Sequence, residues 1–284
     1  MKKILLYLST EKHASAFDIT VAHDSGVDVV LPYDNVELDE VADIIYHSLF
    51  PRGPKELKNT AVFIGGHQIM KAKEYLKKTL ETLDRLPLGM RVSVALDPDG
   101  AYTTASACVG NIKEYIRVDG MNAVVLAGTG PVGQSVAALL AKEKCRVTLT
   151  SRHKKRAEET TKNLREEYGI HVEAAEAGTA AQLKDVLINA QVVVAAGPEG
   201  VQLLPENLWS GLEKLRVLAD LNSVPPYGIS GVDEIDRVVK KHGKTVIGSI
   251  YTGNHKMRIH QEIIKQIFRD TDQVFDLYKT YELA

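Results

Sequence analysis

The chain has 284 residues, of which 44% are hydrophobic and 25% charged, and this profile suits a soluble globular protein of about two domains. Its 35 Lys and Arg nearly balance its 37 Asp and Glu, so the formal net charge of -2 provides no basic surface for nucleic acid or an anionic membrane. No apolar run reaches the ~20 residues that cross a bilayer. We therefore expect neither a nucleic-acid nor a membrane partner.

Strand-like and helix-like segments alternate over the first third of the chain. Apolar segments typical of strands are predicted at residues 3–9, 27–31, 61–64 and 91–96. Segments with helical composition or spacing are predicted at residues 13–21, 36–50 and 69–83. This alternation predicts a parallel α/β sheet. The apolar start is too brief for a signal sequence and lacks a cleavage site, so it is interpreted as the first strand.

A second alternating half follows a small-residue helix predicted at 103–116. Its strands are predicted at residues 123–126, 146–150, 192–195, 217–219 and 245–247. Its helices are predicted at residues 132–141, 154–167, 180–188, 233–241 and 258–281. We therefore predict an α/β protein of two α/β domains with a cleft between them. The first spans 1–105 and is joined by a C-terminal helix at 270–284, and the second spans 106–269.

A glycine-rich turn joins the strand at 123–126 to the helix that follows. The turn consists of Gly128, Thr129, Gly130, Pro131, Val132 and Gly133. A G-x-G-x-x-G segment in this strand–helix context is the Rossmann dinucleotide fingerprint, although a turn without a ligand is the alternative. Gly128 would make the tight turn, Gly130 would let the backbone approach the pyrophosphate, and Gly133 would let the helix pack closely. The helix N-terminus would supply N–H groups for the phosphates.

The end of the next predicted strand favours NADP over NAD. NAD enzymes usually carry Asp or Glu there for the ribose 2′-hydroxyl. This chain has Ser151 and Arg152 instead, with Arg156 one turn further on. Arg152 can pair with a 2′-phosphate, Ser151 can donate a hydrogen bond, and Arg156 can add charge. The further cofactor-binding candidates, at the ends of later strands, are Ala196, Gly197, Asn222 and Gly248.

Polar loops containing glycine or proline follow three other predicted strands, at residues 65–67, 97–104 and 220–226. Ligands of α/β sheets bind outside the carboxyl ends of the strands, so we expect these loops to face one cleft. Each loop by itself could be an ordinary turn. Lys256, before the last predicted helix, is a further site candidate, although surface exposure is the commoner fate of a lysine.

Several other kinds of site lack their sequence signals. The nine histidines have no metal-binding spacing, so no metal is expected. There is no G-x-S-x-G elbow, no P-loop and no Tyr-x-x-x-Lys pair. Cys108 and Cys145 cannot form a disulfide framework, which indicates a cytoplasmic protein. Both are expected to be small buried apolar residues rather than nucleophiles.

Six stretches of the chain together resemble one family. They are residues 17–18 with 24–26, 63–66, 97–104, 124–133, 220–228 and 248–260. The runs 126–133 and 222–226 are the most specific. On these residues the chain resembles the NADP-dependent methylene-tetrahydromethanopterin/methylene-tetrahydrofolate dehydrogenases of methylotrophic bacteria.

The resemblance implies hydride transfer from a methylene-pterin to NADP in one-carbon metabolism. The carrier would be tetrahydromethanopterin, tetrahydrofolate or both, and the protein a homotrimer. The N-terminal domain would bind the pterin and the Rossmann domain the NADP. Lys256 matches an active-site lysine and would orient the pterin or tune its electrostatics. The substrate-binding candidates are Asp18, Gly66, His67, Asp97, Gly100, Thr103, Thr104 and His255.

Two other functions stay open at this stage. A different NADP-dependent two-domain oxidoreductase, similar to shikimate dehydrogenase or glutamyl-tRNA reductase, would need a catalytic Cys or a Lys–Asp pair in the N-terminal half, and neither is evident. A redox sensor that binds NADP(H) without turnover would need a basic DNA-binding module, which the charge balance does not offer.

Overall fold

The computed structural model describes residues 1–87 and 89–284, and the chain divides into two compact units. Unit 1 comprises Met1–Thr103 and Met257–Leu283, and unit 2 comprises Thr104–Lys256 with Ala284. The predicted domain boundaries lie at 105/106 and 269/270. The structure places the second boundary earlier, between Lys256 and Met257, so residues 257–269 belong to unit 1.

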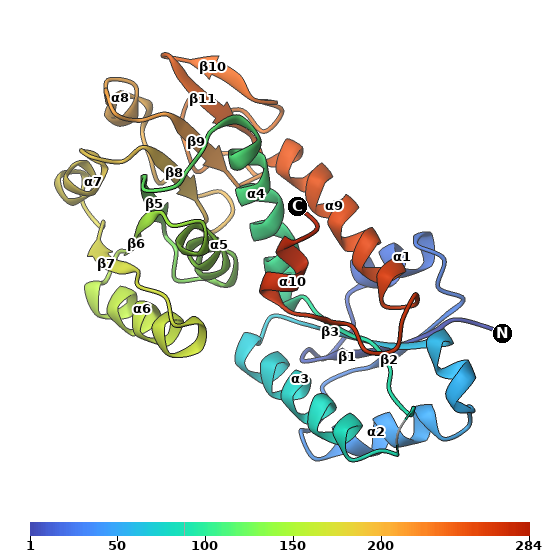
Figure 1. The fold of residues 1–284 in the computed structure, drawn as a ribbon. Coiled ribbons are helices and arrows are strands. Elements are labelled where there is room, and N and C mark those ends of the chain that lie inside the picture. Colours follow the sequence, from blue (N-terminus) through green and yellow to red (C-terminus); the bar gives the residue numbers. More distant parts are fainter. Residues whose placement is uncertain (88) are drawn as a thin grey trace. The chain divides into compact units, whose positions relative to one another are not determined.

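Unit 1 is built on a five-stranded parallel sheet in the order β12-β4-β3-β1-β2. Its strands are β1 (Ile4–Ser9), β2 (Val29–Tyr33), β3 (Thr60–Gly65), β4 (Val94–Leu96) and β12 (Val274–Phe275). Every residue of β3 is buried, because helices cover both faces of the sheet (Figure 1). A strand buried on both faces needs a continuous apolar run rather than an alternating one, and β3 has this pattern.

The helices of unit 1 lie on the two faces of its sheet. They are α1 (Ala16–Asp24), α2 (Glu40–Leu49), α3 (Ile69–Asp84) and α10 (Leu277–Tyr281), with short 3-10 turns η1 (Pro54–Asn59) and η2 (Pro98–Gly100). In α3, Ala72, Tyr75, Thr79 and Leu83 are buried at intervals of three or four residues. This spacing places one stripe of the helix against the core, while Lys77 is exposed.

Unit 2 is built on a seven-stranded sheet in the order β10-β11-β9-β8-β5-β6-β7. Its strands are β5 (Asn122–Leu126), β6 (Arg146–Ser151), β7 (Glu173–Glu176), β8 (Val192–Ala195), β9 (Val217–Asp220), β10 (Val239–Lys241) and β11 (Lys244–Ile247). All neighbouring pairs are parallel except β10 with β11. The parallel strands have the 3-2-1-4-5-6 order of dinucleotide-binding sheets, with the switch point between β5 and β8. The predicted α/β class and Rossmann unit are confirmed.

Four helices lie wholly within unit 2 among its described residues: α5 (Pro131–Lys142), α6 (Lys154–Tyr168), α7 (Ala180–Leu187) and α8 (Glu206–Trp209). Two further helices, α4 (Ala101–Tyr115) and α9 (Ser249–Gln266), contain the divisions between the units. A core cluster joins Leu183 and Leu187 of α7 to Trp209 and to β5, β8 and β9. The Trp209 indole N–H donates to the carbonyl of Ser230 at 2.9 Å, so this large buried ring leaves no polar atom unsatisfied.

The prediction of a helix at 233–241 is wrong. The segment forms a turn followed by β10, which pairs antiparallel with β11. His242 and Gly243 connect the two strands, and both have positive φ, of 49° and 74°. Positive φ at both central residues is the geometry of a tight hairpin, which fits β10 into the sheet instead of continuing a helix.

The single helix predicted at 258–281 is also wrong, because α9 ends at Gln266 and the chain returns as β12 and α10. Strand pairing overrides the helical periodicity here: the Val94 N–H donates to the carbonyl of Gln273 at 2.8 Å. The buried Ser93 hydroxyl donates to the carbonyl of Asp270 at 2.8 Å and accepts the Gln273 N–H at 3.1 Å. The strand β7 and the short helix α8 were not predicted.

Removing the Ser93 hydroxyl should loosen the return of the chain to β4. Ser93→Ala removes two part-buried hydrogen bonds, one to the carbonyl of Asp270 and one from the N–H of Gln273, each with a net worth of about 0.5–1.5 kcal/mol. We expect a lower urea midpoint for unfolding, followed by circular dichroism. Ser48→Ala is the matched control, since its hydroxyl donates only to Ile44 within α2. Equal midpoints for the two variants would contradict the role assigned to Ser93.

Candidate functional site

The glycine-rich turn has the close contacts of a phosphate-binding turn. A Cβ on Gly133 would lie 2.5 Å from the Gly128 Cα, so α5 packs directly on the turn, as predicted. The positive φ falls at Ala127, at 50°, and a Cβ on Gly128 would instead lie 2.8 Å from Leu149 Cγ. A Cβ on Gly130 would meet nothing within 4 Å.

The start of α5 therefore has room for a ligand. Gly130 is the N-cap and makes no side-chain capping bond, and Pro131 occupies the first turn. Gln134 braces the turn by donating from Nε2 to the carbonyl of Thr129 at 2.7 Å. The first N–H groups of a helix have no partner within the helix, so a close, uncapped start suits a bound pyrophosphate.

The end of β6 carries the residues predicted to distinguish NADP from NAD. Ser151 is buried, and its Oγ accepts the His153 N–H at 3.2 Å. Arg152 is exposed, and so is Arg156 near the start of α6. The first turn of α6 contains no acidic residue. Cations at a helix N-terminus oppose the helix dipole. A bound phosphate would remove this conflict, so the structure fits the predicted 2′-phosphate position.

The remaining cofactor candidates lie at the carboxyl ends of β8, β9 and β11, in the same sheet. A Cβ on Gly197 would lie 2.7 Å from Leu203 Cδ1, and one on Gly248 would lie 2.2 Å from the Asp233 carbonyl oxygen. Ala196 donates its N–H to the carbonyl of Leu126 at 3.1 Å. Asn222 is buried, and its side-chain amide bonds within its own loop. The structure thus brings the predicted cofactor residues to one edge of the unit 2 sheet.

In unit 1, the loops after β3 and β4 are joined to each other. The Asp99 N–H donates to the carbonyl of Gly66 at 3.0 Å, and the His67 imidazole pairs with the Asp99 carboxylate. Gly66 has a φ of 104°, and a Cβ there would lie 2.1 Å from Thr10 Oγ1. Only glycine fits this close approach between strand ends.

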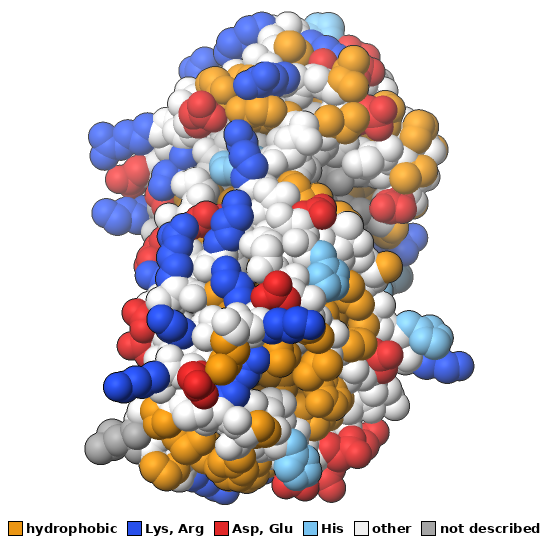
Figure 2. Space-filling model, turned by 90° about the vertical axis from the view of Figure 1, so that its right-hand side faces the viewer, with side chains coloured by type: hydrophobic (Ala, Val, Ile, Leu, Met, Phe, Trp, Pro, Cys, Tyr) orange, Lys and Arg blue, Asp and Glu red, His pale blue; other side chains and the backbone are white. Residues whose placement is uncertain are grey.

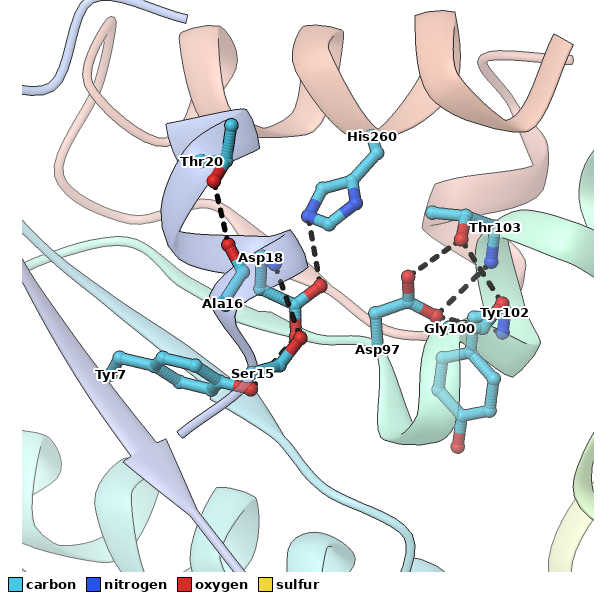
Figure 3. Close-up of polar contacts among 10 residues, drawn as sticks. All are labelled: Tyr7, Ser15, Ala16, Asp18, Thr20, Asp97, Gly100, Tyr102, Thr103 and His260. Carbon is cyan, nitrogen blue, oxygen red and sulfur yellow. Dashed lines mark hydrogen bonds and ion pairs between the residues drawn. The ribbon is translucent and has the colours of Figure 1, made fainter. Parts of the chain in front are cut away.

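Asp97 and Thr103, two predicted pterin ligands, bond to each other at the start of α4 (Figure 3). Asp97 Oδ1 accepts the N–H groups of Tyr102 and Thr103 at 2.9 and 3.2 Å, and Oδ2 accepts the Thr103 hydroxyl at 2.6 Å. The Thr103 hydroxyl also lies 3.2 Å from the carbonyl of Gly100. Asp97 is 2% exposed, so its carboxylate is used to organise this turn and the helix that follows.

Asp18, which is partly buried, belongs to a polar cluster with the buried Tyr7 and His260 that the sequence did not reveal (Figure 3). The Tyr7 hydroxyl donates to Asp18 Oδ2 at 2.7 Å, and His260 Nε2 lies 4.0 Å from Asp18 Oδ1. The His260 ring stacks on Phe63 with centroids 5.3 Å apart. Burial, together with the Asp18 charge, raises the pKa of Tyr7, so the hydroxyl remains a donor. The sequence offers one signal for His260: it follows the candidate Lys256 by four residues, which places both on the same face of a helix.

Thr104, His255 and Lys256 belong to unit 2 and are half-buried. His255 Nδ1 lies 2.8 Å from Asn111 Oδ1, which joins α9 to α4 within this unit. Lys256 is the last residue of α9 assigned to unit 2. Because Lys256 lies within the 18-residue helix α9, the position of its backbone is fixed.

The described residues give little support to a cysteine nucleophile, a metal site or a membrane span. Burial raises the pKa of both Cys108 and Cys145 to about 12, so both are thiols and not nucleophiles. Across residues 1–87 and 89–284, no group of three or more His, Cys, Asp or Glu could hold a metal ion. None of the helices in those ranges is long and apolar enough to span a membrane.

A cavity of about 560 Å³ lies between the ends of α4 and α5. Residues 113–119 and 142–144 line it. These segments immediately precede β5 and β6, so the cavity lies at the opposite edge of the sheet from the cofactor candidates. The carboxyl edge, where dinucleotides bind, is the relevant one for the chemistry.

Comparison with known proteins identifies the family. Residues 16–99 match the model of the methylene-tetrahydromethanopterin dehydrogenase N-terminal domain. A relative from Methylorubrum extorquens AM1, the bifunctional protein MdtA, is 36% identical over 100% of this chain and 98% of its own. The chain belongs to the methylene-tetrahydromethanopterin dehydrogenase family. A second relative of that organism, an NAD(P)-dependent methylenetetrahydromethanopterin dehydrogenase, is 28% identical over the same shares of both chains.

Two further comparisons concern the fold. Residues 123–221 match the model described as NADP oxidoreductase, coenzyme F420-dependent. The shikimate 5-dehydrogenase of Listeria monocytogenes, solved with shikimate and NAD, superposes with a TM-score of 0.53. It is 11% identical and the match covers 99% of this chain and 96% of that one, which shows a shared fold and no more. The match over residues 16–99 and the full-length similarity to MdtA confirm the family that the sequence resembles.

Arg152 should distinguish NADP from NAD. Arg152→Ala is expected to raise the KM for NADP by about 10- to 100-fold, the effect of losing a hydrogen bond to a charged group. The KM for NAD should stay within about threefold, because NAD lacks the 2′-phosphate. Lys162→Ala in α6 is the control, since Lys162 lies about two turns into that helix and pairs with Glu166. An equal loss for both cofactors would remove Arg152 from the 2′-phosphate site.

Proposed function

We propose that this protein is an NADP-dependent dehydrogenase that oxidises the methylene group of methylene-tetrahydromethanopterin to methenyl. The observation that carries the proposal is the pairing of a close-packed glycine turn with a cationic β6 end, in a chain 36% identical to a family member over its full length. The methylene C–H bond breaks with its electron pair, the hydride reduces the nicotinamide ring, and the two flanking nitrogens share the positive charge of the product. No proton transfer is obligatory.

The residues of this chain bind the two reactants and orient them. The start of α5 at Gly130 holds the pyrophosphate, while Ser151 and Arg152, assisted by Arg156, hold the 2′-phosphate. NADP supplies the hydride-accepting carbon. The ends of β8, β9 and β11 shape the nicotinamide half of the site, because the two halves of such a sheet each bind one mononucleotide. Catalysis then comes mainly from fixing two bulky reactants at the correct distance and angle.

The pterin contacts are assigned from the same reasoning. In unit 1 the candidates are Asp18, Gly66, His67, Asp97, Gly100 and Thr103, which lie in α1 and in the segments that follow β3 and β4. In unit 2 they are Thr104, His255 and Lys256. Because Asp97 and Thr103 bond each other, we propose that they present a shaped turn to the pterin, while Lys256 supplies a positive charge that orients it.

Tetrahydrofolate as a second carrier, a role in methylotrophic one-carbon metabolism, a cytoplasmic location and a homotrimer belong to the same proposal. Self-association is supported by large apolar side chains exposed on unit 1, including Phe50 at 60% and Met70 at 69%. Figure 2 shows hydrophobic side chains gathered in one area of the visible face and charges of both signs interspersed elsewhere. Exposed apolar area of this kind is typical of interfaces.

The decisive experiment follows NADPH absorbance with the purified protein. Methylene-tetrahydromethanopterin and methylene-tetrahydrofolate are supplied in parallel, each with NADP and with NAD. We expect turnover with methylene-tetrahydromethanopterin and NADP. Silence with both carriers and both cofactors would overturn the proposed function, whereas turnover with one carrier assigns it.

Lys256→Gln should affect the KM for the pterin more than it affects kcat. We expect the KM for the methylene-pterin to rise by about 10- to 100-fold, because one charged hydrogen bond is lost, and kcat to fall by less than about 10-fold. Lys265→Gln, at an exposed residue of the same helix, is the control. A near-complete loss of kcat with unchanged KM would instead assign Lys256 to the chemical step.

A further inference from the structure

Asp220 closes a loop at the carboxyl end of β9 with a single carboxylate. The residue is 2% exposed. Its Oδ1 accepts the N–H of Asn222 at 3.0 Å, and its Oδ2 accepts the N–H of Ile229 at 2.6 Å. Burial raises the pKa of Asp220, and the backbone N–H groups that donate to it oppose the rise. The two ends of the segment 221–229 are thereby fixed to one side chain.

The same loop is joined to the neighbouring loop after β8. The N–H groups of Leu203 and Leu204 both donate to the carbonyl of Gly228, at 2.8 and 3.0 Å. A Cβ on Gly228 would lie 2.7 Å from Asp220 Oδ1 and 3.1 Å from the Ala195 Cβ. The ends of β8 and β9 therefore form one packed assembly, and the Asp220 carboxylate is at its centre.

Asn222 supports this loop from within. Its Oδ1 accepts the Val224 N–H at 2.9 Å, and its Nδ2 donates to the carbonyl of Pro226 at 3.2 Å. Both ends of the amide are thus engaged by the loop itself. The predicted cofactor residue Asn222 acts on the loop's shape, and it depends on Asp220 for the position of its own N–H.

The sheet order says which part of a dinucleotide this assembly serves. β5 and β6 lie on one side of the switch point and carry the residues for the pyrophosphate and the 2′-phosphate. β8, β9 and β11 lie on the other side and belong to the half that takes the nicotinamide. Asp220 is therefore separated from Arg152 by the intervening strands β8 and β5.

We propose that Asp220 is a positioning residue for hydride transfer, which fixes the course of residues 221–229 and through them the nicotinamide ring without touching it. This inference rests on the proposed use of NADP as hydride acceptor. Asn at this position could accept at one oxygen, but its amino group would face a backbone N–H that now has an acceptor. Asp220→Asn should therefore shift the loop while keeping the size of the side chain.

The test compares the two halves of the cofactor. In D220N we expect the Kd for NADPH to rise by about tenfold, while the Kd for 2′,5′-ADP, which lacks the nicotinamide half, stays within about twofold. kcat should fall by about 10- to 100-fold, since a small misplacement of reacting groups is enough. The primary deuterium isotope effect on kcat, with a deuterated methylene donor, should be no smaller than in the wild type. Asp185→Asn, an exposed acid on α7, is the matched control.

Each outcome decides the proposal. A kcat within about threefold of the control variant, or equal weakening of NADPH and 2′,5′-ADP, overturns it. If D220N does not fold, Asn222→Ala is judged by the same comparison, because it releases the loop while leaving the carboxylate in place. If the wild type turns over no methylene-pterin, the proposed function fails, and the two binding constants still judge Asp220 separately.

Discussion

Parallel strands buried on both faces leave room for polar chemistry only at their ends, and this constraint governs both units. β3 is buried along its whole length, and so is β8. A polar side chain along such a strand would lose its water without gaining a partner. Functional groups are therefore confined to the strand ends, and at the carboxyl edge the N-termini of the following helices also offer N–H groups. Gly133 against Gly128 allows one of these helices to approach closely.

Buried carboxylates at these edges are held by hydrogen bonds from the protein itself. Asp97 accepts from two backbone N–H groups and from Thr103, and Asp220 accepts from the two ends of its loop. The partly buried Asp18 accepts the Tyr7 hydroxyl and faces His260. A buried charge is tolerated when such donors surround it, and it then rigidifies the loop that supplies them. The edges are thus preorganised, which is the condition that hydride transfer between two large reactants requires.

Sequence patterns predicted what is local and missed what is long-range. The glycine turn and the Ser151-Arg152 end lie within one strand–turn–helix unit, so their spacing alone indicated their place. The segment 233–241 was misassigned because the positive φ of His242 and Gly243, not the apolar spacing, decides for a hairpin. β12 forms because it pairs with β4, a strand that is distant in the sequence and has an edge available for pairing. Tyr7, Asp18 and His260 meet from three elements, which no short pattern records.

The starts of the helices show how local stability and ligand binding diverge. α1 has a Ser15 cap and Asp18 in its first turn, and α7 has a Thr179 capping box, as a helix N-terminus favours. α6 instead begins with cations and no acid, which costs about 0.3–1 kcal/mol for each charge near the dipole. α5 begins at Gly130 without a side-chain cap. Both departures fall where phosphates are proposed to bind, so a bound cofactor would supply the negative charge that these two helix starts lack and would stabilise unit 2.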